Sequence, residues 1–275
     1  MTDLRIIIVC QARLGSTRLP RKVLLPLAGQ PLILRFLERV AQSRLATEVV
    51  VATTEETCDD VLANTCADAG YNVFRGHSTD LLDRHYRAAL AYQADVVVKI
   101  PSDCPLIDPS VIDAVIGAYI DNVDSVDYVS NLHPGTWPDG NDVEVMSMKV
   151  LERAWHAAEQ PHEREHTTPW MWDNNPEVRV SNVSWSNGLD LSMSHRWTID
   201  YPEDYVLMKA IYDNLYLIHP RFSTAKILSF LIDHPEVAGA NAHLAGVNWY
   251  RNHIDQLKTI DERHTRDYPS HSQPV

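Results

Sequence analysis

The sequence predicts an α/β fold in which helices pack against a mostly parallel sheet. Residues 6–9, 48–52 and 95–100 are short runs rich in β-branched residues, which is typical of strands buried on both faces of such a sheet. Segments with apolar residues at helical spacing separate these runs, so the expected order is strand, helix, strand, helix, strand. Such an order predicts parallel strands, because each helix returns the chain across the sheet in a right-handed crossover.

The expected helices combine apolar residues at helical spacing with recognisable start or stop residues. Gly70 is a stop signal for the second helix, and Pro-Glu-Asp at 202–204 suits the first turn of a later one. We expect helices over 32–43, 59–70, 80–93, 111–122, 150–160, 202–215 and 224–233. Two more short strands are expected over 128–130 and 196–200.

Residues 1–262 are expected to form one domain. Within it, residues 131–195 hold many aromatic and turn residues and do not continue the alternation of strands and helices, so we expect an insertion that serves as a lid or as a dimer arm. The alternative is that its tryptophans only pack the insertion onto the core. Residues 263–275 are polar and rich in histidine, and a mobile tail is expected there.

The charge of the chain limits its partners. The 275 residues include 37 acidic and 24 basic ones, which gives a formal net charge of −13. Binding to the phosphate backbone of nucleic acid needs a broad basic face, so nucleic acid is not an expected partner. No apolar run approaches the roughly 20 residues of a membrane span, and we expect a cytoplasmic protein with neither a leader segment nor a membrane partner. Reduced thiols are expected, since no C-x-x-C pair occurs among Cys10, Cys58, Cys66 and Cys104.

The loop after the first expected strand concentrates positive charge. Residues 10–22, CQARLGSTRLPRK, hold several cations and no acid. Backbone N–H groups around Gly15, the hydroxyl of Ser16 and several Arg or Lys side chains suit a polyphosphate. The loop is not a Walker motif, because no second glycine precedes Lys22. A solvated basic turn is the alternative interpretation.

Two aspartates follow expected strands that are far apart in the sequence. Asp103 comes after 95–100, and Asp200 ends 196–200. Ligands bind beyond the carboxyl ends of strands in open α/β sheets, and Mg²⁺ in phosphoryl chemistry is usually held by one or two carboxylates plus the phosphates. The two residues therefore predict a shared magnesium site. A role at helix N-termini is expected instead for Asp108, Glu203 and Asp204.

Several motifs together resemble the cytidylyltransferase family. They occur in order from about residue 5 to about residue 255: QARLGSTRLPRKVL (11–24), VVVATT (49–54), VFRGHSTDLLDRHYRAA (73–89), SDCPLIDP (102–109), PDGNDVEV (138–145), EREHTTPW (163–170) and RWTIDYPEDY (196–205). The chain is most similar to the branch named after a spore-coat polysaccharide biosynthesis protein. It is more distantly similar to CMP-sialate and CMP-deoxyoctulosonate synthetases.

The resemblance implies a three-layer, Rossmann-like nucleotidyltransferase fold of the type shared with GT-A glycosyltransferases. It also implies a homodimeric enzyme with Mg²⁺ as cofactor. The implied reaction joins CTP to a small acceptor and releases pyrophosphate, in the synthesis of surface polysaccharides or glycoconjugates. A sugar acid and a small phosphorylated or phosphonate compound both fit as the acceptor. Only a hydroxyl nucleophile would call for a general base.

The resemblance also implies roles for individual residues. The implied catalytic residues are Arg13, Lys22, Asp103 and Asp200, of which the two aspartates hold the metal. The implied nucleotide-binding residues are Ala12, Arg13, Gly15, Ser16, Arg18, Lys22, Thr53, Asp80 and Ser102. The implied acceptor-binding residues are Arg84, Asp142, Glu144, Arg164 and His166. Alternatives remain for all five acceptor-binding residues. They are a helix-surface position for Arg84, an ion pair with Glu165 for Arg164, a structural or exposed position for His166, and a Pro-Asp-Gly turn leading into a strand for Asp142 and Glu144.

One motif departs from the family pattern. Residues 99–102 are Lys-Ile-Pro-Ser where the branch usually has Arg-Ile-Thr-Gly, which affects the shape of the base pocket. A nucleotidyltransferase for another base is a rival, although such enzymes usually have a doubled glycine where this chain has Gln11-Ala-Arg. A glycosyltransferase would normally offer a D-x-D motif, which Asp103 does not belong to. A catalytically silent nucleotide-binding module is the third rival, and the presence of both aspartates and Lys22 argues against it.

Overall fold

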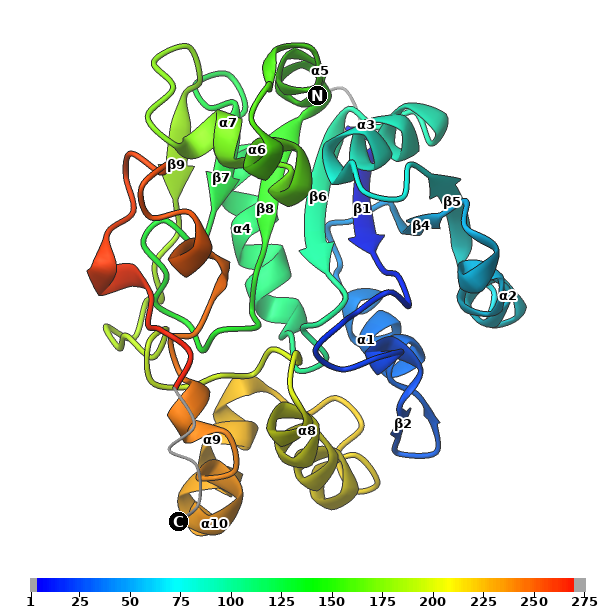
Figure 1. Ribbon diagram of the computed structural model, residues 1–275, viewed down its shortest axis with the longest axis vertical. Helices are drawn as coiled ribbons and strands as arrows, with labels where there is room; N and C mark the ends of the chain where they lie inside the picture. The colour runs from blue at the N-terminus through cyan, green and yellow to red at the C-terminus, as the bar shows by residue number, and fades with distance from the viewer. Residues whose placement is uncertain (1–3, 270–275) are drawn as a thin grey trace.

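The computed structural model describes residues 4–269 and is built around one seven-stranded sheet (Figure 1). The strands lie in the order β5-β4-β1-β6-β8-β7-β9. All neighbouring pairs are parallel except those made by β8, which is antiparallel to both β6 and β7. The sheet strands are β1 (Ile6–Gln11), β4 (Glu48–Thr54), β5 (Asn72–Gly76), β6 (Val96–Pro101), β7 (Tyr128–Ser130), β8 (Glu144–Ser147) and β9 (Val180–Asn182). A separate small hairpin joins β2 (Pro26–Leu27) and β3 (Gln30–Pro31).

Helices cover both faces of the sheet, which confirms the three-layer α/β fold. Alternate residues of β1 face opposite ways: Ile6 and Ile8 pack against α1 and α4, and Ile7 and Val9 pack against α3 and α5. A strand buried on both sides must be apolar throughout, which explains its sequence. The helices are α1 (Leu32–Val40), α2 (Asp60–Asp68), α3 (Leu81–Ala91), α4 (Pro109–Asp121), α5 (Met148–Ala157), α6 (Pro161–His166), α7 (Pro169–Trp172), α8 (Pro202–Leu215), α9 (Thr224–Asp233) and α10 (Pro235–Ala238).

Capping residues explain where several helices begin. Asp108 accepts a hydrogen bond from the Ser110 backbone N–H at 2.9 Å, and Pro109 fills the first turn of α4. Asp108 also accepts from the backbone N–H of Thr224 at 2.7 Å, so one carboxylate serves the starts of both α4 and α9. This confirms the expected capping role of Asp108.

The strand expected over 196–200 is wrong. Arg196 makes a single bridge to Asp139, and no strand follows it. The backbone N–H groups of this segment are used by two different loops: Trp197 N donates to Asp139 O, and Ile199 N donates to Asp103 O at 2.8 Å. The segment has bends at Thr198 and Asp200 and lies between these two loops rather than beside a strand.

Part of the segment 131–195 belongs to the core of the fold. Strand β8 pairs with β6, and Val145 and Met146 are fully buried on its two faces. Helices α5, α6 and α7 lie over the same face as α3 (Figure 1). A lid or dimer role for the remaining loops stays a prediction.

The chain after α10 folds back along the sheet edge that carries β7 and β9, as the orange-to-red ribbon shows in Figure 1. It contains three short 3₁₀ turns, η3 (Ala242–Leu244), η4 (Trp249–Asn252) and η5 (Glu262–His264). Arg266 N donates to Gly246 O at 2.8 Å, which ties the two ends of this segment together. The tail expected over 263–275 therefore starts within a packed region, and its last residues, 270–275, lie outside the described part of the chain.

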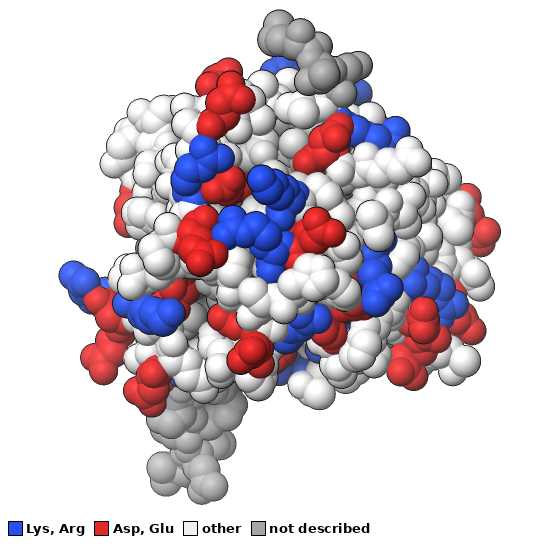
Figure 2. Space-filling model, turned by 90° about the horizontal axis from the view of Figure 1, so that it is seen from above, with Lys and Arg blue, Asp and Glu red and all other residues white. Residues whose placement is uncertain are grey.

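On the face drawn in Figure 2, a small group of basic side chains is bordered by acidic ones, and no broad basic patch covers the face. Ion pairs such as Arg87 with Asp83 at 2.8 Å and Arg153 with Glu177 at 2.8 Å show the same interspersion. Among residues 4–269, no helix is both long and apolar enough to cross a membrane.

Candidate active site

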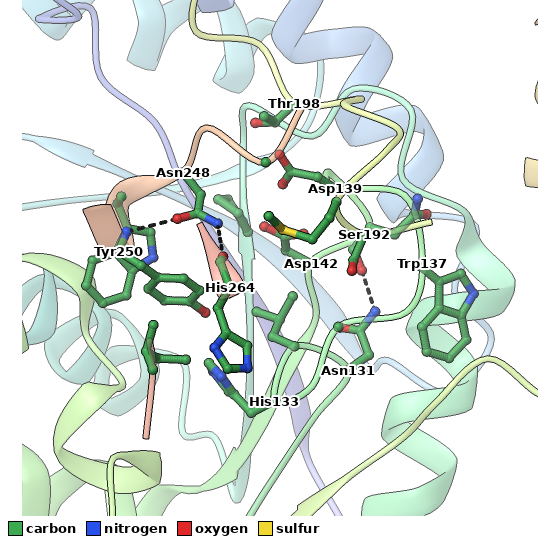
Figure 3. A pocket seen from close by; sticks show the side chains of 18 of the residues that line it. Asn131, His133, Trp137, Asp139, Asp142, Ser192, Thr198, Asn248, Tyr250 and His264 are labelled. Atoms are coloured by element: carbon green, nitrogen blue, oxygen red, sulfur yellow. Dashed lines mark hydrogen bonds between the residues drawn. The ribbon is translucent and has the colours of Figure 1, made fainter. Parts of the chain in front are cut away.

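A cavity of about 890 Å³ opens at the carboxyl ends of β1 and β6. Gln11 and Pro101, the last residues of these strands, line it together with Asp103. Most of the other lining residues come from three segments, within 131–144, 190–200 and 246–264, and Arg18, His166 and Trp172 also contribute to the walls. Figure 3 shows polar groups from all three segments facing one space, among them Asn131, Ser192 and Asn248. Ligands of open α/β sheets bind at this edge.

Lys22 brings the two predicted metal ligands together. Its ammonium donates to Asp103 Oδ2 at 3.1 Å, to Asp200 Oδ1 at 2.9 Å and to the carbonyl oxygen of Ile199 at 2.8 Å. Burial by itself lowers the pKa of Lys22, but the two carboxylates outweigh burial and raise it above its usual value. Lys22 therefore stays charged. One cation at this position reaches both aspartates.

Arg18 makes a second cation contact with the same carboxylate. Its guanidinium lies 2.7 Å from Asp200 Oδ1 and lines the cavity. Burial raises the pKa of Asp200, but Lys22 and Arg18 oppose it and hold the pKa below its usual value. The basic loop and the end of the 196–200 segment thus meet at one carboxylate.

The donor set fits a divalent cation that arrives with phosphates. In the described residues, no group of three or more His, Cys, Asp or Glu side chains could hold a metal ion. Asp103 and Asp200 are two hard oxygen ligands that already share one cation. Mg²⁺ is typically bound by one or two carboxylates, with substrate phosphates and water completing its shell.

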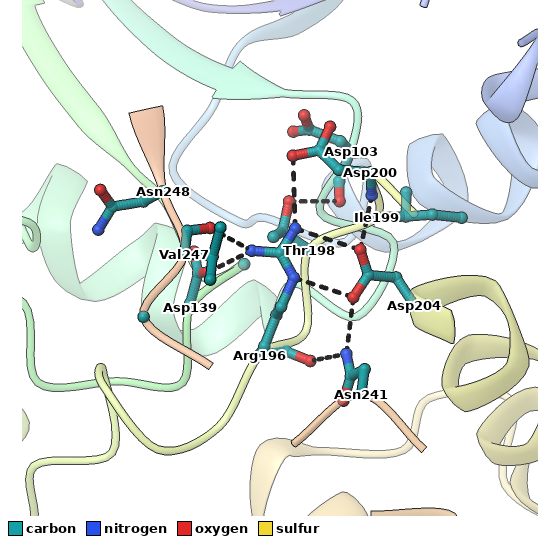
Figure 4. A network of polar contacts seen from close by, with 12 residues as sticks. Asp103, Asp139, Arg196, Thr198, Ile199, Asp200, Asp204, Asn241, Val247 and Asn248 are labelled. Atoms are coloured by element: carbon teal, nitrogen blue, oxygen red, sulfur yellow. Dashed lines mark hydrogen bonds and ion pairs between the residues drawn. The ribbon is translucent and has the colours of Figure 1, made fainter. Parts of the chain in front are cut away.

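Arg196 is a residue of the site that the sequence did not reveal (Figure 4). Its side chain is buried, with Nε donating to Asp204 Oδ1 at 2.9 Å and Nη2 donating to Asp204 Oδ2 at 3.1 Å. Nη1 donates to the carbonyl oxygen of Val247 at 2.6 Å, and Nη2 reaches Asp200 Oδ2 at 3.4 Å. Asn241 completes the network, donating to Asp204 Oδ1 at 2.8 Å. Arg196 therefore joins a predicted metal ligand to the C-terminal wall of the cavity.

Two further acids lie in the cavity near the metal pair. Burial, followed by the charge of Asp103, raises the pKa of Asp142 to about 6. Burial and then Asp142 raise the pKa of Asp139 well above its usual value. Asp142 Oδ1 accepts from the backbone N–H of Gly140 at 3.1 Å, and Asp139 lies 3.6 Å from Arg196. This end of the cavity is rich in carboxylates.

Glu144 and His166, two predicted acceptor residues, also line the cavity. The charge of Glu144 is balanced by Lys99, and the imidazole of His166 is uncharged. Glu144 forms a buried ion pair with Lys99 and accepts from the Tyr128 hydroxyl at 2.6 Å. Burial opposes ionisation, but Lys99 keeps the pKa of Glu144 below its usual value. Burial and then Lys99 lower the pKa of His166 to about 3, and its ring stacks on Trp249 at 3.7 Å between centroids.

Other predicted residues lie outside the cavity. Arg164 is paired with Asp80, its Nε donating to Oδ2 at 2.8 Å. Arg84 is buried and donates to the carbonyl oxygen of His77 at 3.0 Å, and burial with the nearby Arg13 lowers its pKa to about 10. In the basic loop, Arg13 and Gly15 are exposed and Ser16 is half-buried. Buried positions at the strand ends are taken by Ala12, Thr53 and Ser102. None of these six residues lines the cavity.

The C-terminal wall of the cavity was not predicted. Asn248, Tyr250 and His264 point into it in Figure 3, and Asn248 fixes the wall by donating to the carbonyl oxygen of His264 at 2.8 Å. The hydroxyl of Tyr250 makes no hydrogen bond within the described part of the chain. Burial, and then the nearby charges of Glu144, Asp142 and Asp139, raise the pKa of this hydroxyl well above its usual value. The run of aromatic residues at 249–250 was the only available signal.

Nucleotide transfer needs carboxylates for a divalent cation, positive charge for a polyphosphate and room for a second substrate. This edge of the sheet brings all three together, because Asp103, Asp200 and Arg18 line the cavity and Lys22 binds both carboxylates from beside it, which defines the class of protein as a nucleotidyltransferase. Comparison with known proteins narrows the class: the chain belongs to the cytidylyltransferase family, whose sequence model matches residues 6–223. This confirms the family that the motifs indicate.

Three relatives show how far the similarity extends. The spore coat polysaccharide biosynthesis protein SpsF of Bacillus subtilis is 31% identical over 238 residues, which is 85% of this chain and 96% of SpsF. A solved cytidylyltransferase from Leptospira borgpetersenii is 32% identical, with a TM-score of 0.80 over 86% of this chain and 97% of its own. The 3-deoxy-manno-octulosonate cytidylyltransferase of Chlorobaculum parvum is 38% identical over 162 residues, 58% of this chain and 57% of that protein.

Proposed function

We propose that this protein transfers CMP from CTP to an oxygen atom of a small acceptor and releases pyrophosphate. The observation that carries the proposal is the pairing of Asp103 and Asp200 around one cation, beside a basic loop at the carboxyl edge of the sheet. Membership of the cytidylyltransferase family supports CTP as the nucleotide. The acceptor oxygen attacks the α-phosphorus, the bond from that phosphorus to the bridging oxygen breaks, and pyrophosphate leaves.

Mg²⁺ held by Asp103 and Asp200 would supply charge neutralisation for the phosphates. The chain contributes positioning and further positive charge. Lys22 and Arg18 stabilise the charge that develops on the leaving pyrophosphate, and backbone N–H groups near Gly15 donate to phosphate oxygens. Arg13 and Ser16 extend this cradle. Residues 77–80 form a loop that is held by two arginines: Arg84 donates to the carbonyl oxygen of His77, and Arg164 pairs with Asp80. We propose that these side chains act on the nucleotide and the acceptor by positioning this loop.

The cavity is the proposed acceptor site. A phosphate or phosphonate placed against Asp139 and Asp142 would meet two carboxyl groups whose pKa values are already raised by burial and by neighbouring acids, whereas hydroxyl groups can donate to their oxygens in either protonation state. A sugar acid is therefore the favoured acceptor class, with its hydroxyls on these acids and Asp142 receiving the proton from the attacking hydroxyl. Arg251 and Arg263, which line the cavity from the C-terminal segment, offer positive charge for its carboxylate.

Pyrophosphate release tests the proposal. Purified protein with Mg²⁺ is given CTP, UTP, GTP or ATP together with a panel of acceptors that starts with 3-deoxy-manno-octulosonate and N-acetylneuraminate and includes small phosphonates. We expect release that depends on CTP and on a sugar acid. Release with UTP, GTP or ATP at equal or higher rates would favour the second candidate, a nucleotidyltransferase for another base, which the unusual Pro101-Ser102 pair at the base pocket allows.

We also propose a cytoplasmic homodimer in which loops of 131–195 contribute the contact. Sedimentation equilibrium checks the dimer, since the chain has a mass of 31.2 kDa and a dimer twice that. A homogeneous monomer at micromolar concentration would contradict it.

A further inference from the structure

The ammonium group of Lys22 occupies the position from which a single cation reaches both predicted metal ligands. Its three N–H donors are all used, on Asp103 Oδ2, Asp200 Oδ1 and the carbonyl oxygen of Ile199, at 2.8–3.1 Å. Only 12% of the side chain is exposed. The contact is therefore a fully satisfied, largely buried arrangement and not a chance encounter of surface charges.

The oxygen atoms of Asp200 are also committed. Oδ1 is shared by Lys22 at 2.9 Å and Arg18 at 2.7 Å, and Oδ2 lies 3.4 Å from the buried guanidinium of Arg196. A divalent cation that entered between the carboxylates would meet the charges of Lys22 and Arg18 at close range. In a partly buried site, water screens such like charges only weakly, so the repulsion disfavours the metal.

We propose that Lys22, assisted by Arg18, is an internal counter-ion that keeps divalent metal out until a triphosphate arrives. The triphosphate gives both side chains new anionic partners, and at the same time supplies the oxygens that complete the metal shell. Release of the two carboxylates and binding of the metal then become one event. The metal enters with the nucleotide and not before it. This inference rests on the proposed function only in its last step, the exchange of carboxylate for phosphate.

The location of Lys22 allows this exchange. It begins η1 (Lys22–Leu24) and follows a loop whose residues Gly15, Thr17 and Arg18 are exposed. Both of its backbone hydrogen bonds are local: Lys22 N donates to Leu19 O at 3.2 Å, and Lys22 O accepts from Leu25 N at 3.2 Å. Arg196, by contrast, is locked in the core by Asp204 and the carbonyl oxygen of Val247. We therefore assign the movable charges to Lys22 and Arg18 and the fixed one to Arg196.

Binding of Mn²⁺ without any nucleotide tests the proposal directly, because it needs neither CTP nor an acceptor. Titration calorimetry and the electron paramagnetic resonance signal of free Mn²⁺ are measured for the full chain and for Lys22→Met, which removes the charge but keeps the length. The matched control is Arg21→Met, an exposed neighbour that makes no ion pair among residues 4–269. We expect Lys22→Met to bind Mn²⁺ about tenfold more tightly than the unaltered protein, with Arg21→Met within about twofold of it.

Two further variants make the result specific. Adding Asp103→Asn to Lys22→Met should remove the gain, which locates the bound Mn²⁺ at the carboxylates. Arg18→Met removes one partly exposed charge from Asp200 and should raise Mn²⁺ affinity by a smaller factor, about threefold. Because Arg18 is less buried than Lys22, this variant still tests the proposal if Lys22→Met folds poorly. Equal Mn²⁺ affinity in the unaltered protein, Lys22→Met and Arg18→Met would overturn the proposal. Failure of the proposed function would show differently, as absence of CTP-dependent pyrophosphate release, whatever the Mn²⁺ result.

Discussion

The guanidinium of Arg196 donates two hydrogen bonds to the carboxylate of Asp204, at 2.9 and 3.1 Å, and both side chains are almost fully buried. Asp204 in turn accepts from the backbone N–H of Asp200 at 2.8 Å, so the buried pair fixes the backbone that presents a predicted metal ligand. A structural ion pair and the catalytic edge are thus parts of one network.

Loss of one partner of this pair should be costly. We expect Asp204→Ala to lower the free energy of unfolding by about 3–5 kcal/mol, because it leaves the charge of Arg196 buried with fewer partners. Chemical denaturation monitored by circular dichroism measures this. The control is Asp213→Ala, which breaks the exposed ion pair with Lys209 on the same helix and should cost no more than about 0.5 kcal/mol. Similar losses in both variants would contradict the argument.

Gly140 allows the loop that carries the cavity acids to pass over the 196–200 segment. Its φ is +103°, and a Cβ atom there would lie 2.5 Å from the backbone carbon of Trp197. We expect Gly140→Ala to cost about 2–4 kcal/mol of stability, from the overlap and the unfavourable backbone conformation together. Thermal unfolding measures it, with Gly117→Ala in α4 as the control. A Cβ there meets only Leu45 at 3.8 Å, so this helical substitution should stabilise the protein slightly.

Much of the fold could be predicted because a strand buried on both faces has a recognisable sequence. The central strands β1, β4 and β6 are continuous β-branched runs, and each was expected close to where it lies. Strand β5 was missed because Asn72–Gly76 is only partly buried and carries mixed residues. The antiparallel strand β8 pairs with β6 across a long stretch of chain, and nothing local in the sequence specifies that partner.

The closeness of Asp103 and Asp200 was predicted from two strand ends, and this reason holds only for Asp103, which follows β6, because Asp200 ends a segment that is not a strand. The motifs of the basic loop and of 196–205 pointed to the same place independently. Lys22 and Asp200, 178 positions apart, were expected at the same place and lie 2.9 Å apart. Arg196 and Tyr250 could not be predicted in this way. Their positions depend on how the C-terminal segment returns to the sheet, which follows from tertiary packing and not from a local pattern.

Removal of one predicted metal ligand should separate activity from folding. We expect Asp103→Asn to reduce CTP-dependent pyrophosphate release by at least about 100-fold, because charge at the phosphates is no longer neutralised in the transition state. Its unfolding transition should stay within a few degrees of the unaltered protein. Asp121→Asn, at the exposed end of α4, serves as the control and should keep full activity. Turnover near normal in Asp103→Asn would remove this residue from the mechanism.

Tyr250 should affect the acceptor and not the nucleotide. Its hydroxyl lies among the cavity acids, and no group in residues 4–269 accepts its proton. We expect Tyr250→Phe to raise the KM for the acceptor about fivefold to tenfold while the KM for CTP stays unchanged, since one hydrogen bond is lost. Steady-state pyrophosphate release with the first active sugar acid measures both constants. Tyr92→Phe, far from the cavity, is the control.

Asp142 should destabilise the ligand-free protein at neutral pH. Burial and Asp103 raise its folded-state pKa to about 6, so the folded protein prefers the protonated carboxyl, and the stability that it contributes below about pH 4 is lost as the pH rises towards 6. A full shift of this size corresponds to about 3 kcal/mol, and water in the cavity screens part of it. We therefore expect Asp142→Asn to be about 1–2 kcal/mol more stable than the unaltered protein at pH 7.5 and equally stable at pH 4. Denaturation across this pH range measures the difference, with the exposed Asp255→Asn as a control that should show none. Greater stability coupled to loss of acceptor turnover would mean that the chain keeps this carboxylate for its chemistry, at the expense of its fold.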